Sequence, residues 1–385
     1  MPARPRKEIV DANSPGYYLV SQQVVRGLRL TGVDPYTGRD YTYRQEKLEQ
    51  RIRDLASLYL VEVAEFSCGA DGFQLLVRIR PDLVSTLSHE EVARRMLRRS
   101  EKQLALLPPP TDEAVEQVVS DVRRVNKMRE RIANLSQFMG DIDEAMARDV
   151  NREARRGPTK LPVGRLWQGR FHSVKVLDEP ALLLAAVHVE VQKVVDHEAV
   201  DLVSVEYASA TIRAEDFPGC MPSPLNGLAD PESRPPTETS RIEISQSEPP
   251  HIEGLDAEAS NEPTSAGWLL SMERAGATAA GETSATFETG PYLQIGYRAF
   301  RHVLEWTLEA LTSPSRDSAP AVAPDLQAVL DRFRVRVDVW FEAVRNFRQW
   351  FRTAVGCGDA LKSYARHLGV AWLAGQGCRR HPFLE

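Results

Sequence analysis

The chain has 385 residues, a length that predicts two or three domains rather than one. Hydrophobic residues make up 42% and charged residues 26%, so the chain can bury a substantial core. No apolar run reaches the roughly 18 residues that would span a membrane. The four cysteines are scattered, which argues against a disulfide framework or a cysteine zinc site. We therefore expect a cytoplasmic protein that has no membrane partner.

The net charge of −6 conceals two regions of opposite sign. Residues 214–290 contain 14 Asp and Glu against 3 Lys and Arg. Residues 148–175 contain eight Lys and Arg against two acidic residues. A local basic stretch of this kind indicates a nucleic-acid-binding surface even where the whole chain is acidic.

The N-terminal half predicts an α+β domain. Alternating apolar and polar residues predict strands over 17–26, 60–67, 73–80 and 171–177. Apolar residues at helical spacing predict helices over 43–59, 88–98, 112–131, 134–153 and 179–195. This order predicts a ferredoxin-like antiparallel sheet with packed helices. We place that domain at 15–212, with a basic arm at 1–14 and a helical insertion at about 104–133.

The composition changes after this domain. Residues 213–289 are rich in Pro, Ser, Thr and Glu and predict a disordered acidic linker, although a partner-binding or DNA-mimicking role stays open. Helical periodicity returns over 292–311, 325–332, 336–354 and 359–374. Residues 290–385 therefore predict a small α-helical C-terminal bundle.

Four motifs occur in order along the chain. The stretch 66–77 predicts a strand, a tight turn and a second strand. Residues 135–139 are followed by Asn151 and Arg152, residues 164–171 contain Trp-x-x-Arg-Phe, and 178–184 begin a helix. Together they resemble the single-tyrosine HUH transposases, in particular the REP-associated tyrosine transposases. The resemblance covers residues 15–205 and 290–375.

In that family two histidines on the second strand of the hairpin hold Mg or Mn, and a tyrosine on a later helix attacks a DNA phosphodiester. Here the two histidine positions hold Gly72 and Gln74, and the tyrosine position holds His188. Glycine has no side chain to donate, and one amide oxygen cannot replace two imidazoles. The resemblance therefore implies a catalytic site that is not intact, with the metal cofactor lost. Gly72→His with Gln74→His would return two imidazoles to one face of the strand.

The basic stretch is where the family places DNA. The expected partner is single-stranded or hairpin DNA, with a homodimer as a further expectation from the family. Trp167 and Phe171 could stack on an unpaired base, but we expect them to pack inward. The candidate DNA-binding residues are Arg152, Arg155, Arg156, Lys160, Arg165, Arg170 and Lys175.

Two other functions stay open. One is an active strand transferase with an unusual site, in which Gln74, Asp71 or Glu65 binds metal and His188 or Tyr207 is the nucleophile. The other is a non-DNA interaction protein that reuses the fold. Carboxylate partners for the arginines of 148–175 would favour the second alternative.

Overall fold

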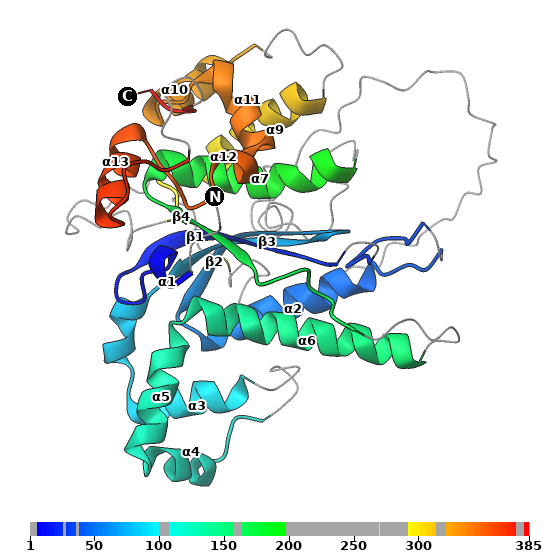
Figure 1. Cartoon of the computed structure of the whole chain (residues 1–385), viewed down its shortest axis with the longest axis vertical. Coiled ribbons are helices and arrows are strands. Elements are labelled where there is room, and N and C mark those ends of the chain that lie inside the picture. The colour runs from blue at the N-terminus through cyan, green and yellow to red at the C-terminus, as the bar shows by residue number, and fades with distance from the viewer. Residues whose placement is uncertain are drawn as a thin grey trace, which may run out of the picture.

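The computed structural model describes residues 6–25, 28–35, 38–99, 108–156, 164–197, 269, 292–312, 321–374 and 381–384. The side chains of 6, 7, 156 and 193–197 are outside this description. The fold is α+β: a five-stranded mixed sheet lies between two layers of helices (Figure 1). This confirms the expected class.

The sheet has the strand order β2-β3-β1-β4-β5. Strands β1 to β4 pair antiparallel with their neighbours, and the short β5 pairs parallel with β4. The strands are β1 (Gly16–Gln23), β2 (Val61–Gly69), β3 (Gly72–Ile79), β4 (His172–Val176) and β5 (Ala354–Val355). The hairpin expected over 66–77 is therefore present, with its turn at Ala70 and Asp71.

Helices α2 and α6 cover one face of the sheet, and α3, α4 and α5 extend that layer beyond the sheet (Figure 1). Strand residues such as Phe66, Leu75 and Val77 point into this layer and share its core. The elements are α1 (Arg6–Ile9), α2 (Tyr43–Leu58), the 3-10 helix η1 (Pro81–Thr86), α3 (His89–Arg98), α4 (Asp112–Val119), α5 (Val122–Ile132) and α6 (Leu135–Arg156).

The single helix expected over 112–131 is two helices, α4 and α5. The break falls at Ser120 and Asp121. The Asp121 carboxylate accepts the backbone N–H groups of Arg123 and Arg124, at 3.0 and 3.2 Å. Two amides that begin a new helix are thereby satisfied, which favours restarting the helix there.

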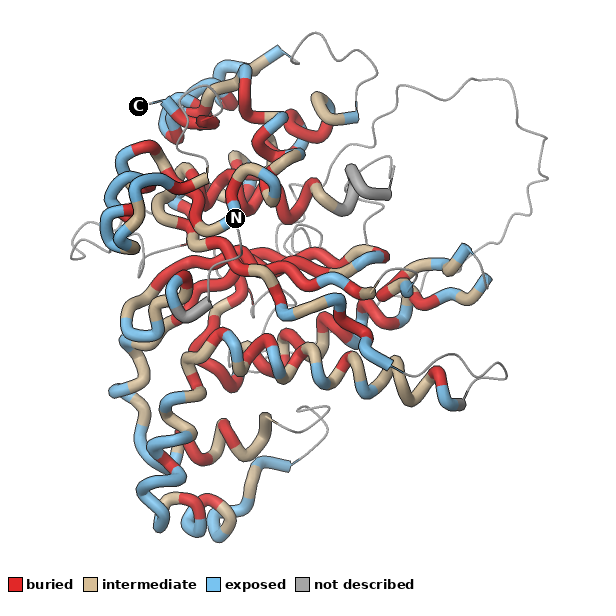
Figure 2. Tube along the Cα trace, viewed as in Figure 1, coloured by how far each residue is buried: buried red, intermediate tan, exposed pale blue. Residues whose placement is uncertain are grey.

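The opposite face of the sheet is covered by α7, which is itself covered by the C-terminal helices. Every residue from 181 to 191 is buried, as the continuous red of α7 in Figure 2 shows. A helix that is apolar on all sides must be buried on all sides, and the run Ala181–Val187 has that composition. The elements of this layer are α7 (Glu179–His197), α9 (Tyr297–Thr312), α10 (Pro324–Arg332), α11 (Val337–Arg345), α12 (Phe347–Trp350) and α13 (Gly358–His367).

The C-terminal residues share one core with α7 and the sheet. Trp340 and Phe347 belong to the same buried cluster as Leu19 and Leu76. The helix expected over 336–354 ends early, because the chain leaves helical geometry at Asn346 and again at Phe351 and then forms β5. That strand hydrogen-bonds to the open edge of β4, since Lys175 N donates to Thr353 O.

Of the linker expected over 213–289, the description includes Leu269 alone. Leu269 is buried and forms an isolated parallel bridge with Val63 of β2. Among the helices that the structure describes, none combines the length and the apolar character needed to cross a membrane.

Asp178 joins the start of α7 to the C-terminal segment. Its Oδ1 accepts the Ala181 N–H at 3.0 Å, and its Oδ2 accepts the Cys357 N–H at 2.6 Å. Burial raises the pKa of the carboxyl, and these hydrogen bonds oppose the rise without cancelling it. One side chain therefore satisfies two amides from distant parts of the chain.

We expect Asp178→Ala to lower the free energy of unfolding by about 2–3 kcal/mol, because it removes a helix cap and leaves the Cys357 amide without an acceptor. Asp178→Asn keeps an acceptor oxygen, so its free energy of unfolding should fall by less than half as much. Urea unfolding followed by circular dichroism measures both. Equal losses in the two variants would contradict this role.

Candidate nucleic-acid interface

An open groove of about 360 Å³ lies between α6 and the segment 164–171. The wall formed by α6 consists of Ser136, Gly140, Asp143 and Ala147. These residues follow one another at intervals of three or four, so they occupy one face of the helix. Three of the four have very small side chains, which keeps the groove open.

Backbone bonds hold the opposite wall to β1 and its extension. Gln168 N donates to Gln23 O, and Val25 N donates to Leu166 O, both at 2.8 Å. The Asn151 side chain bonds both backbone groups of Gly164, at 3.1 Å each. The segment is therefore fixed on α6 as well as on the sheet.

Trp167 and Phe171 pack inward, as the sequence predicted. They are 7% and 5% exposed. The Trp167 indole N–H donates to Asp143 O at 2.9 Å, and its ring meets Phe73 edge to face at 5.6 Å. These aromatics anchor the wall, and neither ring is exposed to stack on a base.

Arg165 and Arg170 flank this anchor and line the groove. Both are exposed, and neither has an ion pair or hydrogen-bond partner among the described residues. The one carboxylate in the lining is Asp143, whose Oδ2 accepts a bond of 3.1 Å from Gln22 Nε2. Two guanidinium groups on a fixed wall can bind phosphate oxygens in pairs.

The arginines of α6 have different surroundings. Arg155 is exposed and has no partner within the described part of the chain. Arg152 pairs with Asp149 at 2.8 Å, and Arg148 pairs with Glu144. Both of these pairs are exposed to solvent, where an ion pair stabilises little and is easily exchanged.

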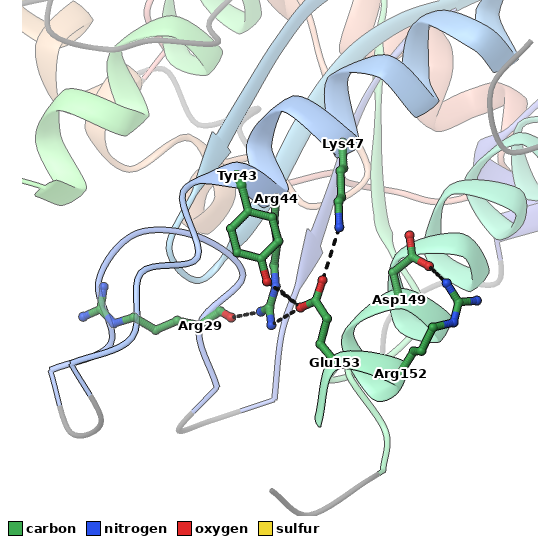
Figure 3. A network of polar contacts seen from close by, with 7 residues as sticks. All are labelled: Arg29, Tyr43, Arg44, Lys47, Asp149, Arg152 and Glu153. Carbon is green, nitrogen blue, oxygen red and sulfur yellow. Dashed lines mark hydrogen bonds and ion pairs between the residues drawn. The ribbon is translucent and has the colours of Figure 1, made fainter. Parts of the chain in front are cut away.

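Glu153 fixes the C-terminal part of α6 on α2 (Figure 3). Its carboxylate accepts hydrogen bonds from Tyr43 at 2.8 Å, from Arg44 at 2.8 and 3.0 Å, and from Lys47 at 3.3 Å. Burial raises the pKa of Glu153, but the bonds from Tyr43 and Arg44 outweigh it and hold the pKa below its usual value. Arg44 also donates to Arg29 O at 3.1 Å. The network directs Arg44 and Lys47 toward Glu153, and neither cation lines the groove.

Lys175, another of the predicted DNA-binding residues, does not line the groove. Lys175 lies toward the other end of β4, where its ammonium stands 5.2 Å from the centre of the Tyr364 ring. Lys160 and the Arg156 side chain lie outside the described residues. The structure thus brings Arg165 and Arg170 together, leaves Arg152 and Arg155 along α6, and separates Lys175 from all four.

The two positions that correspond to metal-binding histidines face α7. Along β3, Leu75 and Val77 point toward α2 and α6, whereas Gln74 and Leu76 point to the opposite face. Leu76 belongs to the buried cluster that contains α7. Gln74 is 7% exposed, and its carbonyl oxygen has no donor among the described residues. Gly72 has φ +156°, and a Cβ there would overlap the Gln22 carbonyl oxygen and lie 3.0 Å from Gln23 Cα.

A row of polar residues crosses the sheet at Gln74. Its neighbours in register are Ser67 on β2, Ser21 on β1 and, beyond Ser21, His172 on β4. Burial lowers the pKa of His172, and the nearby charges of Arg348 and Arg352 lower it further. Gln74 and His172 are two strand spacings apart, about 10 Å, which is too far to share a metal ion. This row is not predictable from the sequence, because the register between strands cannot be read from one strand at a time.

His188 points away from the sheet. Its Nδ1 lies 2.8 Å from Val344 O on α11, and its ring stacks on Phe347 at 4.8 Å. A carbonyl only accepts, so Nδ1 carries the proton and Nε2 is a bare acceptor in the core. Burial lowers the pKa of His188 to about 4. His188 is therefore a neutral packing residue, and the structure does not bring it to Gln74.

The other residues of the alternative catalytic site are scattered. Asp71 is exposed in the hairpin turn, Glu65 is fully buried on β2, and Tyr207 lies outside the described residues. Across the described ranges, no group of three or more His, Cys, Asp or Glu is arranged to hold a metal ion. A divalent metal does not fit the donors at 72 and 74.

Cys357, Asp178 and His381 come close together at the start of α7, where they hold the C-terminal segment to this helix. Burial and then the Asp178 charge raise the pKa of the Cys357 thiol to about 12, which keeps it protonated. His381 Nε2 is bonded to Gly356 O at 2.8 Å, so this nitrogen is not available as a base.

No family model matches this chain, and neither a curated protein nor a solved structure is significantly similar to it. The resemblance to the single-tyrosine HUH transposases therefore stays a prediction from the motifs.

We expect Gly72→Ala to destabilise the protein by about 2 kcal/mol or more, because the backbone conformation and the Gln22 carbonyl both exclude a side chain. Gly72→His should lower the free energy of unfolding further, because its side chain is larger. The variant with both Gly72→His and Gln74→His should therefore not fold well enough to bind metal. Denaturant unfolding is the measurement. Gly140→Ala is the matched control, since its Cβ meets nothing within 4 Å and alanine favours a helix. A Gly72→Ala variant as stable as the wild type would show that the turn is wrongly described.

Below pH 6.5 we expect His188 to make the protein acid-sensitive. The unfolded state takes up a proton near 6.5, whereas the folded state resists it until about 4, so stability falls as the pH falls through this window. The loss is on the order of 3 kcal/mol at pH 4. His188→Gln can keep the bond to Val344 O without a titratable group. Unfolding free energies from pH 7 to 4 should therefore fall less in this variant; parallel curves would refute the assignment.

Proposed function

We propose that this protein binds single-stranded or hairpin DNA through the groove between α6 and residues 164–171. The observation that carries the proposal is the pair Arg165 and Arg170. Both stand on an anchored wall of an open groove without a carboxylate partner among the described residues. Exposed guanidinium groups that no carboxylate neutralises attract a polyanion, and a fixed backbone spares the cost of ordering them on binding.

The groove favours contacts to phosphates over contacts to bases. Its lining offers two guanidinium groups against one carboxylate, Asp143, while its aromatic residues Trp167 and Phe171 are buried. Phosphate contacts position a nucleic acid without reading its sequence. Binding should therefore depend strongly on salt and weakly on base composition.

We further propose that the protein is a catalytically inactive relative of the single-tyrosine HUH transposases, with a ferredoxin-like domain. The order β-α-β-β-α-β, with β2 and β4 on either side of the central pair β3 and β1, supports this. So does the position of Gly72 and Gln74 on the face toward α7, the helix that follows the Trp-x-x-Arg-Phe motif. Lost catalysis is supported by Gly72, which cannot hold a side chain, and by His188, which bonds to α11.

A second candidate function, a protein-interaction surface on the same scaffold, is favoured by one observation. Arg148 and Arg152 do have carboxylate partners, namely Glu144 and Asp149. A helix face with alternating charges suits a solvated or protein-bound surface. The groove arginines have no such partners among the described residues, and for this reason we prefer DNA.

Arg165→Gln with Arg170→Gln should weaken binding to an unpaired oligonucleotide roughly tenfold. The slope of log affinity against log salt should become shallower by about 1.4, which corresponds to two lost phosphate contacts on a single strand. Electrophoretic shifts at several salt concentrations measure both quantities.

The matched control is Arg148→Gln with Lys175→Gln. It removes two positive charges from the same basic stretch, 148–175, at residues that do not line the groove. It should retain nearly wild-type affinity. If the wild-type protein fails to shift hairpin or single-stranded DNA at low salt, the proposal is wrong. If the two double variants behave alike, binding does not use the groove.

A further inference from the structure

Helix α5 presents a second basic surface. It carries five cations against one carboxylate, Glu130. Val125 and Ile132 are buried against the neighbouring helices, and Arg129 turns inward to donate to Val84 O at 2.6 Å. Of the four remaining cations, Arg123, Arg124 and Lys127 are exposed and Arg131 is half-buried.

Three of these cations form a line. Arg123, Lys127 and Arg131 stand four residues apart, so successive Cα atoms are about 6 Å apart along the helix axis. Like charges at this spacing repel each other and weaken the helix. A line of this kind is not expected from folding stability alone, and it matches a ligand with regularly repeated negative charges.

Two arginines of α3, which packs beside α5, have carboxylate partners. Arg94 bonds Asp112 at 3.0 Å, and Arg95 bonds Glu91 at 2.5 Å. In contrast, no outward cation of α5 has an ion pair or side-chain bond in the described part of the chain. The Asp121 carboxylate at the start of α5 instead accepts backbone amides.

The basic side of α5 is continuous with the groove along the chain. Helix α5 ends at Ile132 and α6 begins at Leu135, and Asn134 between them accepts the N–H of Ser136 at 2.9 Å. Ser136 lines the groove. Figure 1 shows α5 running away from this end of α6. Helix α5 therefore adjoins the end of the groove at Ser136.

We propose that the outward side of α5 is a second DNA contact, which binds the phosphates of a duplex stem while the groove holds the unpaired strand. This inference rests on the proposed function. Duplex DNA carries twice the axial charge density of a single strand, which suits a row of cations. An acidic protein partner fits less well, because protein interfaces centre on apolar and aromatic residues. Beyond Val122 in the first turn, the outward side of α5 offers no exposed apolar residue.

The test uses the full chain and three probes of common sequence: a hairpin with an unpaired flank, the blunt duplex stem alone, and the unpaired flank alone. Arg123→Gln with Lys127→Gln should weaken hairpin and duplex binding roughly tenfold and make the salt slope shallower by about 1.8, with flank binding unchanged. Arg94→Gln with Arg95→Gln is the control for charge, since it removes two paired arginines from α3. Glutamine suits an exposed helix about as well as arginine or lysine, so all variants should melt near the wild-type temperature.

The outcomes separate the two proposals. If the wild-type protein binds the flank and the hairpin but the α5 variant matches the α3 control on every probe, α5 is not a DNA contact and the groove proposal stands. If the wild-type protein binds none of the probes, the proposed function fails. If the α5 variant instead loses binding to polyglutamate while DNA binding is unchanged, the surface belongs to an acidic protein partner and the inference is overturned.

Discussion

The burial of α7 between the sheet and the C-terminal helices is the interaction on which the rest of the fold depends. From Ala181 to Val191 no residue of this helix reaches solvent. One side packs on β2, β3 and β4, and the other packs on α9 and α11. Removing the C-terminal helices would therefore expose an apolar helix surface rather than release an independent unit, since the hydrophobic effect scales with the apolar area left in water.

The position of α7 decides where a macromolecular ligand can approach. On its face of the sheet, Gln74 is buried and His188 is bonded to α11. The other helix layer is more open, and there α6 is held by Glu153 to α2 and by Asn151 to the segment that carries Arg165. Binding through the α6 groove would thus leave the buried core undisturbed. This separation suits a protein that binds DNA without cutting it.

Gly72 and His188, which the family resemblance matches to catalytic positions, serve packing in this structure. Glycine at 72 permits a close approach of β3 to the Gln22 carbonyl, which any side chain would block. A histidine at 188 supplies a hydrogen bond that satisfies a carbonyl of α11 within the core. Neither position could regain a catalytic group without a cost to stability.

The sequence alone determined the strands β1 to β4, most helices of the N-terminal half and the inward packing of Trp167 and Phe171, because periodicity and turn chemistry act over short distances. It did not show the break between α4 and α5. The helix start at Ser88 is one example: its hydroxyl accepts the Glu91 N–H, as the capping pattern predicts. Eight basic residues in one stretch also predicted a nucleic-acid-binding surface, which stays a prediction. They did not predict which cations act together.

Only the tertiary structure decided that Arg165 and Arg170 share a groove while Lys175 lies elsewhere, because β4 carries Lys175 away and Tyr364 comes from residues far along the chain. The same holds for β5, whose two residues form a strand because the edge of β4 has open hydrogen-bonding groups. The direction of His188 was undetermined as well, since α7 is apolar on every side and its periodicity does not show which neighbour each side meets. Local sequence patterns determine the helices and strands. Contacts between distant segments decide which partners a uniformly apolar helix or an open strand edge packs against.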